Sequence, residues 1–306
     1  MLILMGLFNG ARHLEAQLAS LRDCGLGAWE LRVSDDGSSD DGLRILQTFA
    51  QQLEGGACRV HCSYGPGRGF AANYMQLLAD LPEVTGCVAL ADQDDIWLPD
   101  RLARATALLN RIPPGVPAFT CARRLDWRPE TGKVVATRPL RKRPSFANAL
   151  LENVAFGNTI VMNAAAARLA RAAAPRAGGI YAHDWFLYQL LTGAGALCLQ
   201  EEEPAVLYRQ HAGNAIGAQT GALAWLRRKL QVLQGLYALR VSAQVQALIR
   251  CEDMLLPENR ATLVAFLRAR EAPLFGRLRR LRQAGVFRQR FGGILGFWGA
   301  AVLGRV

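Results

Sequence analysis

The chain has 306 residues, of which 51% are hydrophobic, so it can bury one large core with a helical appendage, and two domains of equal size are disfavoured. Its formal net charge is +11. Residues 1–220 are neutral, with 21 basic and 21 acidic side chains, whereas residues 221–306 carry 15 basic and 4 acidic ones. This asymmetry indicates an anionic partner surface for the C-terminal part, either a membrane leaflet or a nucleic acid.

The apolar stretch Met1–Phe8 has no preceding basic residue and is too short for a secretory signal. We interpret it as a buried first strand and expect the protein to stay in the cytoplasm. The seven cysteines lack CxxC spacing, which suits a reducing compartment and indicates no zinc site.

Short runs of Val, Ile and Leu alternate with longer segments of helical periodicity, which is typical of an α/β fold with a mostly parallel sheet covered by helices. The predicted strands are Leu2–Phe8, Leu31–Ser34, Arg59–Ser63, Cys87–Ala91, Ala118–Ala122, Gly157–Met162 and Ala196–Gln200. The predicted helices are Ala11–Cys24, Asp40–Leu53, Phe70–Leu81, Asp100–Leu109, Ala222–Arg250 and Glu258–Arg270. No strand is predicted after His211.

Three carboxylates, Asp92, Asp94 and Asp95, directly follow the apolar run Cys87–Ala91. Crowded acids repel one another and resist desolvation, so a divalent cation is the simplest way to neutralise them. Oxygen ligands favour Mg²⁺ or Mn²⁺, which would bridge the phosphates of a nucleotide. A calcium loop fits poorly, because Trp97 stands where a glycine is needed. The alternative is a solvated acidic turn that caps the next helix.

A second acidic pair, Asp35 and Asp36, also follows an apolar run. Asp36-Gly37 permits a tight turn and Asp40 can cap the next helix, which explains part of the motif structurally. Because ligands of open α/β sheets bind beyond the carboxyl ends of the strands, we expect both acidic clusters to face one crevice.

Several segments appear together in a specific order: LFNGARHLEAQL, VSDDGSSDDG, GRGFAANYMQLL, LADQDDIW, HDW at residues 183–185 and YRQHAGN at residues 208–214. In these segments, across roughly the first 215 residues, the chain resembles the family 2 glycosyltransferases, specifically the bacterial branch with a DQDDxW motif that includes rhamnosyltransferases of surface polysaccharide assembly. The resemblance implies a GT-A nucleotide-sugar-binding domain over residues 1–217.

The resemblance also implies roles for residues at the donor. Asn9 would lie beside the nucleotide, and Asp35 and Asp36 would meet the base and the ribose. Asp92 and Asp94 would form the metal-binding pair, with Asp92 acting through ribose or water.

Further donor contacts are expected on the same grounds. Asp95 and Trp97 would shape the sugar pocket. The loop Gly65–Gly69 does not match a dinucleotide fingerprint, because the glycine spacing is wrong. In the resembled family it lies near the nucleotide, so Arg68 and Asn73 are candidate donor contacts, with loop and helix surface as the equal alternative.

Asp184 aligns with the acid that family members use as general base. Inversion requires a carboxylate that takes the proton of the acceptor hydroxyl while its oxygen attacks the anomeric carbon. The structural alternative is that Asp184 caps a helix at Trp185–Leu191.

Arg209, His211 and Asn214 follow the last predicted strand and belong to the family motif. Arginine can clamp a phosphate and histidine can bind a metal, so this loop is expected to close over the pyrophosphate. Whether His211 binds the metal or the phosphate is left open.

Residues 218–306 are predicted to form a basic helical extension. Leucine and phenylalanine recur at helical spacing from Leu274, and an apolar stretch, Phe291–Gly304, is too short to span a membrane. We expect this tail to lie on an anionic membrane surface on the inner face of the cell membrane. The alternative is that it packs on the catalytic domain or on a second subunit.

Taken together, the sequence predicts an inverting, metal-dependent transferase that moves a sugar, with rhamnose as one candidate, from a nucleotide donor to a saccharide or lipid-linked saccharide acceptor. One alternative is a nucleotidyltransferase acting on a sugar phosphate. The other is a non-catalytic nucleic-acid-binding protein, which would explain the basic tail but leaves the acidic crevice unexplained. No nucleic-acid partner is expected.

Overall fold

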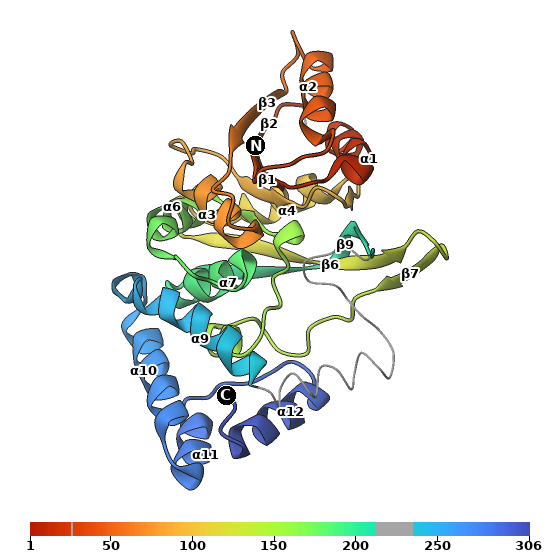
Figure 1. The fold of residues 1–306 in the computed structure, drawn as a ribbon. Helices are drawn as coiled ribbons and strands as arrows, with labels where there is room; N and C mark the ends of the chain where they lie inside the picture. Colours follow the sequence, from red (N-terminus) through yellow and green to blue (C-terminus); the bar gives the residue numbers. More distant parts are fainter. Residues whose placement is uncertain (26, 212–234) are drawn as a thin grey trace.

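The computed structural model describes residues 1–25, 27–211 and 235–306 (Figure 1). Asn214, the boundary expected at residue 217 and the start of the helix predicted from Ala222 lie outside these residues. The strands are β1 Leu2–Leu7, β2 Glu30–Asp35, β3 Arg59–Tyr64, β4 Val88–Ala91, β5 Ile96–Trp97, β6 Ala118–Arg128, β7 Lys133–Ala136, β8 Val161–Met162 and β9 Leu197–Arg209.

The α-helices of the described residues flank this sheet or follow it in the chain. They are α1 Ala11–Arg22, α2 Gly42–Gln52, α3 Phe70–Ala79, α4 Arg101–Leu109, α5 Phe146–Ala149, α6 Ala164–Ala173, α7 His183–Gly193, α9 Leu236–Ile249, α10 Pro257–Glu271, α11 Leu274–Gln283 and α12 Phe291–Val302. None of them is long and apolar enough to cross a membrane.

The strands form one sheet in the order β3-β2-β1-β4-β8-β6-β9-β5, with β7 paired to β6. Strands β3, β2, β1 and β4 are parallel, whereas β8, β5 and β7 join in antiparallel pairs. Leu7 pairs with Asp35, and Met5 with Ala91, so the carboxyl ends of β1, β2 and β4 meet at one edge. The α/β fold class is confirmed, and the sheet becomes mixed in its second half.

Alternation along β1 divides the hydrophobic core into two layers, because successive side chains of a strand point to opposite faces. Leu2 and Leu4 pack with α3, α6 and α7 on one face. Ile3 and Met5 pack with α1, α2 and α4 on the other. A helix layer thus covers each face, which leaves the strand ends as the place where polar groups can gather.

The C-terminal helices gather at the end of the molecule opposite α1 and α2 (Figure 1) and enclose a third apolar cluster. In this cluster Val241 and Phe297 pack with Trp185 and Phe146 of α7 and α5. The apolar stretch of the tail therefore buries part of its surface on the protein, as in the alternative considered for it. The opposite side of α12 keeps exposed apolar side chains, including Phe291 and Leu295.

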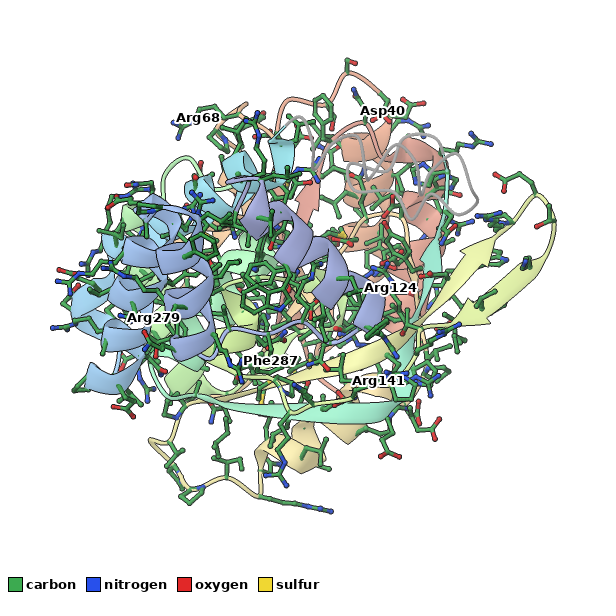
Figure 2. All side chains as sticks on the ribbon, turned by 90° about the horizontal axis from the view of Figure 1, so that it is seen from below. Asp40, Arg68, Arg124, Arg141, Arg279 and Phe287 are labelled. Carbon is green, nitrogen blue, oxygen red and sulfur yellow. The ribbon has the colours of Figure 1, made fainter. Side chains whose placement is uncertain are left out.

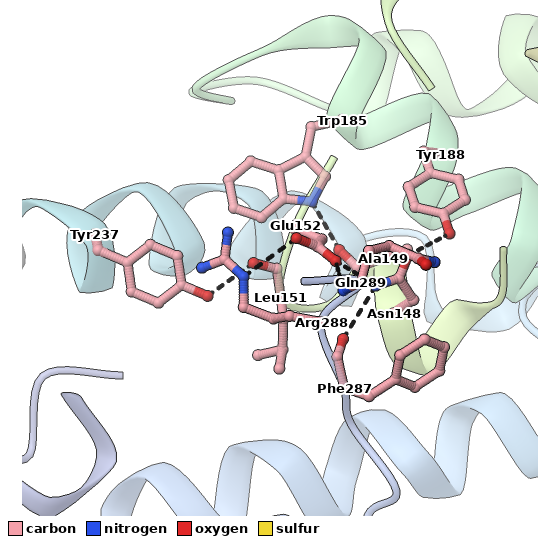
Figure 3. Close-up of polar contacts among 10 residues, drawn as sticks. All are labelled: Asn148, Ala149, Leu151, Glu152, Trp185, Tyr188, Tyr237, Phe287, Arg288 and Gln289. Atoms are coloured by element: carbon pink, nitrogen blue, oxygen red, sulfur yellow. Dashed lines mark hydrogen bonds and ion pairs between the residues drawn. The ribbon is translucent and has the colours of Figure 1, made fainter. Parts of the chain in front are cut away.

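A polar network fixes the C-terminal helices to the α/β part of the chain (Figure 3). Glu152, which follows α5, accepts hydrogen bonds from the backbone N–H of Gln289 and from Nε of Arg288, the latter at 3.2 Å. The side chain of Gln289 is 4% exposed and bonds the backbone of Arg141 and Lys142. Such a network leaves little freedom for the segment between α11 and α12.

Most predicted elements are found, and the differences have physical causes. Strand β6 continues past Ala122 to Arg128, because its polar second half is stabilised by pairing with β7 and β9. The predicted strand Gly157–Met162 is partly wrong: residues 157–159 form a 3₁₀ turn, in which the side chain of Asn158 is buried against Asp95. Helix α6 and the short elements α5, β5 and β7 were not predicted.

Gln244 of α9 provides a test of how the extension is held. Its side chain is fully buried, accepts hydrogen bonds from the backbone N–H of Tyr181 at 2.8 Å and of Ala182, and donates to the carbonyl of Ala182 at 3.0 Å. We expect Gln244→Ala to lower the free energy of unfolding by about 2 kcal/mol, because buried backbone groups lose their partners. Urea denaturation measures this change, and Gln246→Ala at an exposed position of the same helix is the control. Equal stability of the two variants would contradict this anchoring role.

Candidate functional site

A cleft of about 810 Å³ opens at the carboxyl edge of β1 and β4. One wall comes from the strand ends and the start of α3, and the facing wall comes from the turn before α7 and from the C-terminal extension. The predicted site residues that line this cleft are Asp36, Asn73, Asp92, Asp94 and Asp184. The structure therefore brings together both acidic clusters and the predicted base.

Asp94 stands at the centre of an ordered cluster at one margin of the cleft. Its Oδ2 lies 2.8 Å from Nε2 of His211. Its carbonyl oxygen accepts a hydrogen bond from Nε of Arg209 at 2.8 Å. Neither Arg209 nor His211 lines the cleft itself. These two residues reach the site through Asp94, which fits their expected place beside the phosphate-binding region.

Asp95 and Trp97 lie beneath the cleft rather than on its surface. Asp95 is fully buried, bonded to the side chain of Asn158 and to the backbone N–H of Arg209 at 3.1 Å. Trp97 is 2% exposed and lies under the guanidinium of Arg101, 3.8 Å from its ring centroid. Asp95 and Trp97 therefore do not line the cleft and support the acidic loop from below, and their expected part in shaping the sugar pocket stays a prediction.

Burial and mutual repulsion perturb the acids of this loop. The pKa of Asp92 is raised well above its ordinary value, mainly by burial and then by Asp95, Asp94 and Asp184. Burial and Asp94 raise the pKa of Asp95 to about 7. Deprotonating this cluster therefore costs free energy unless a positive charge enters the cleft.

Asp36 organises the glycine loop at the end of the cleft near β2. Its two carboxylate oxygens accept hydrogen bonds from the backbone N–H groups of Gly67 and Gly69, each at 2.7 Å. A Cβ on Gly65 would lie 2.5 Å from Oδ1 of Asn73, so only glycine fits there. That Oδ1 is buried and has no hydrogen-bond partner among the described residues, so it is available to a ligand of the cleft.

Three other predicted donor contacts do not line the cleft. Asp35 is buried and accepts hydrogen bonds from Ser38. Asn9, at a positive φ of 46°, accepts a hydrogen bond from the backbone N–H of Ser39 and thereby joins the loops after β1 and β2. Arg68 is exposed at the tip of its loop (Figure 2). For Asp35 and Asn9 the structure supports a role in loop geometry, and the donor contacts expected of all three residues stay predictions.

Asp184 opens α7 and faces the cleft. Its Oδ2 accepts a hydrogen bond from the backbone N–H of Gly157 at 3.1 Å, and its Oδ1 accepts one from Trp185 at 2.7 Å. The bonds fix the orientation of the carboxylate, which is only partly buried. Helix α7 begins at His183 with Ala182 as its N-cap, so Asp184 lies inside the first turn and does not cap the helix as the alternative expected. Its place in the cleft agrees with the predicted base.

Several cleft residues were not singled out from the sequence. The ring of His183 stacks on Tyr74, with centroids 3.8 Å apart, and burial lowers its pKa to about 4, so it is neutral near pH 7. The guanidinium of Arg124 lies 4.0 Å from the ring centroids of both Phe156 and Tyr208. Gln93 ties the acidic loop to β1 through two hydrogen bonds with the backbone of Phe8. The position of Gln93 inside DQDD was the one signal available.

The family is decided by a match of residues 3–169 to the model of glycosyl transferase family 2. The chain belongs to this family. It is 26% identical over 242 residues to the dTDP-rhamnosyl transferase RfbG of Shigella flexneri, covering 73% of this chain and 77% of that protein. This membership favours glycosyl transfer over the two alternatives considered above.

Solved structures share the fold of this transferase. TarS 1-349 of S. aureus, solved with UDP-GlcNAc, has a TM-score of 0.51 at 14% identity, with 92% of this chain and 89% of that chain covered. The mannosyltransferase PcManGT of Pyrobaculum calidifontis, solved with GDP-Man and Mn²⁺, has a TM-score of 0.51 at 15% identity, covering 99% and 85%. At these identities the likeness concerns the fold alone.

The donor atoms of the acidic loop fit a divalent cation that is shared with a substrate. Oδ2 of Asp94 and Nε2 of His211 are 2.8 Å apart, and two ligands at about 2.1 Å from one ion at a right angle would be about 3 Å apart. No group of three or more His, Cys, Asp or Glu within the described parts of the chain could hold a metal alone. Mg²⁺ is commonly bound by one or two carboxylates together with substrate phosphates, which agrees with this arrangement.

The raised pKa of Asp95 predicts how stability changes with pH when divalent cations are absent. Between pH 4 and pH 7 the folded transferase keeps a proton that the unfolded chain releases, so the free energy of unfolding falls as pH rises, by up to about 1.4 kcal/mol per pH unit for one such group. Asp95→Asn is expected to flatten this dependence. Urea titrations in EDTA across this range measure it, and an unchanged slope in the variant would assign the effect elsewhere.

Proposed function

We propose that this transferase moves a sugar from a nucleoside-diphosphate donor to a saccharide acceptor with inversion at the anomeric carbon, as a step in surface polysaccharide synthesis. One observation carries the proposal: Asp184 lines the same cleft as Asp92 and Asp94. The likeness to a dTDP-rhamnosyl transferase supports rhamnose as the first sugar to test, with dTDP as its carrier.

In the proposed reaction, one residue acts on the acceptor hydroxyl and two others act on the leaving diphosphate. Asp184, oriented by Gly157 and Trp185, accepts the proton of the acceptor hydroxyl as its oxygen bonds to the anomeric carbon. The bond from that carbon to the donor diphosphate breaks on the opposite side. Arg209 and His211, both held on Asp94, stabilise the charge of the departing diphosphate.

Asp92 and Asp94, with His211, would hold Mg²⁺ or Mn²⁺. The ion would supply positive charge to the diphosphate and remove the repulsion that raises the pKa of Asp92. Asp36, Asn73 and the glycine loop would receive the nucleoside, because they form the cleft wall next to the carboxyl ends of β1 and β2.

A substitution of the proposed base Asp184 tests its part in the chemical step separately from substrate binding. We expect Asp184→Asn to lower kcat by about a thousandfold or more, while the affinity for nucleoside diphosphate with Mn²⁺ stays unchanged. The measurements are nucleoside diphosphate release from dTDP-rhamnose with a saccharide acceptor, and calorimetric nucleotide binding. Asp80→Asn, at an exposed carboxylate after α3, is the matched control, and melting temperatures verify folding. Full turnover by Asp184→Asn would exclude this residue as the base.

We also propose that the extension holds the transferase on an anionic membrane surface. Helices α11 and α12 expose Phe275 (86%), Phe291 (66%) and Leu295 (58%). Arg279, Arg280 and Arg282 of α11 are exposed as well. Apolar insertion combined with basic side chains is the pattern of interfacial binding, in which each nearby basic residue contributes about 1 kcal/mol.

Point substitutions test the membrane proposal better than truncation, because α11 and α12 also bury Leu281 and Phe297 in the third core. We expect the double variant Phe275→Ser, Leu295→Ser to lose most of its flotation with phosphatidylglycerol vesicles. Val135→Ser, at an exposed site of β7, should float as the parent does. Undiminished flotation of the double variant would refute this surface as the membrane contact.

A further inference from the structure

The cleft continues past Asp184 to an end that the C-terminal extension completes. Beyond the acids at the strand ends, the remaining wall comes from the residues after α5, the turn before α7, α9 and the segment before α12. Its lining residues include Glu152, Tyr181, Tyr237, Arg240 and Arg288. The basic tail therefore supplies part of the site as well as surface charge.

Arg240 is fixed in this wall by its own helix. One turn further along α9, Gln244 bonds the backbone of Tyr181 and Ala182, directly before the proposed base. This contact sets the guanidinium of Arg240 at 4.7 Å from the ring centroid of Tyr181. No acidic side chain of the described residues lies within ion-pair distance of Arg240. Because the guanidinium of Arg240 lines the cleft without a counter-ion, we expect a ligand of the cleft to supply the negative charge.

Arg288 reaches the same end from the segment before α12. Its Nε donates to Oε2 of Glu152 at 3.2 Å, and its guanidinium lies 5.5 Å from the ring centroid of Tyr237 (Figure 3). The other oxygen of Glu152 already accepts from Gln289 and Asn148. Arg288 is thus paired with an engaged carboxylate, whereas Arg240 is not, and Glu152, Arg240 and Arg288 together carry a net positive charge.

We propose that Arg240 and Arg288 bind the phosphate or diphosphate ester that joins the acceptor saccharide to its carrier. This assignment rests on the proposed function, since it concerns the acceptor of the same reaction. Two guanidinium groups from separate elements suit the charge and oxygen number of a phosphate ester, whereas a single sugar carboxylate needs one bidentate arginine. In the proposed reaction the donor diphosphate has its own partners in Arg209 and His211, both held on Asp94, so we assign the second anionic group to the acceptor.

A binding measurement tests this subsite without turnover. The probe is decyl diphosphate below its micelle concentration, titrated calorimetrically at fixed ionic strength and without divalent cations, so that the acids at the strand ends disfavour it. We expect Arg240→Gln to weaken binding about tenfold, and Arg240→Lys to weaken it less. Arg268→Gln removes the same charge from an exposed site of α10, away from the proposed membrane surface, and should bind as the parent does.

Three outcomes would overturn the assignment. These are equal binding by Arg240→Gln and the parent, equal weakening by Arg268→Gln, and parent binding of decyl glucuronide as tight as that of decyl diphosphate. A further experiment measures nucleoside diphosphate binding with Mn²⁺. Weaker binding by Arg240→Gln in this experiment would assign Arg240 to the donor instead of the acceptor. Because no arm needs sugar transfer, failure here is distinct from failure of the proposed function, which the Asp184→Asn assay reports.

Discussion

The burial of acidic side chains at the end of a core strand is the constraint on which the rest of the site depends. Strand β4 is buried along its whole length, and the residues that follow carry three carboxylates in four positions. Their repulsion and loss of hydration raise the pKa values of Asp92 and Asp95. The fold satisfies Asp95 internally, through Asn158 and the backbone of Arg209, and leaves Asp92 and Asp94 facing the cleft. The unsatisfied charge is thus kept where a cation and a diphosphate can enter.

Strand register explains why this charge sits in a binding cleft. Because β1, β2 and β4 are parallel and in register, their carboxyl ends deliver Asp36, Gln93 and Asp94 to one edge. Asp40 strengthens the same edge, since its carboxylate accepts from the first backbone N–H of α1 and from that of α2. Loops tied to each other in this way can present acids at fixed positions, which lowers the reorganisation needed when substrates bind.

Features that depend on residues close together in the sequence could be predicted, whereas features that depend on residues distant in the sequence could not. The strands β1 to β4 and the helices between them were predictable, since their apolar periodicity is local, and the acid clusters followed from them. The polar half of β6 was not, because its pairing with β7 and β9 is non-local, and Arg124 was missed with it. The burial of Trp97 was missed for the same reason: only tertiary packing shows that its ring lies under Arg101, facing the core. The role of Arg240 depends on a contact between α9 and Tyr181, distant in sequence.

The arginines that give the extension its net positive charge fall into groups with different contacts. Arg270 and Arg277 donate to backbone carbonyls near the end of α12, at Val306 and Ala301, where positive charge stabilises a helix terminus. Arg240 and Arg288 line the cleft, and Arg279, Arg280 and Arg282 of α11 face solvent. One basic segment therefore closes its own fold, completes one end of the cleft and leaves exposed positive charge on α11. An acceptor carried on a lipid phosphate would need all three at once, because its saccharide must reach Asp184 while its carrier stays in the membrane.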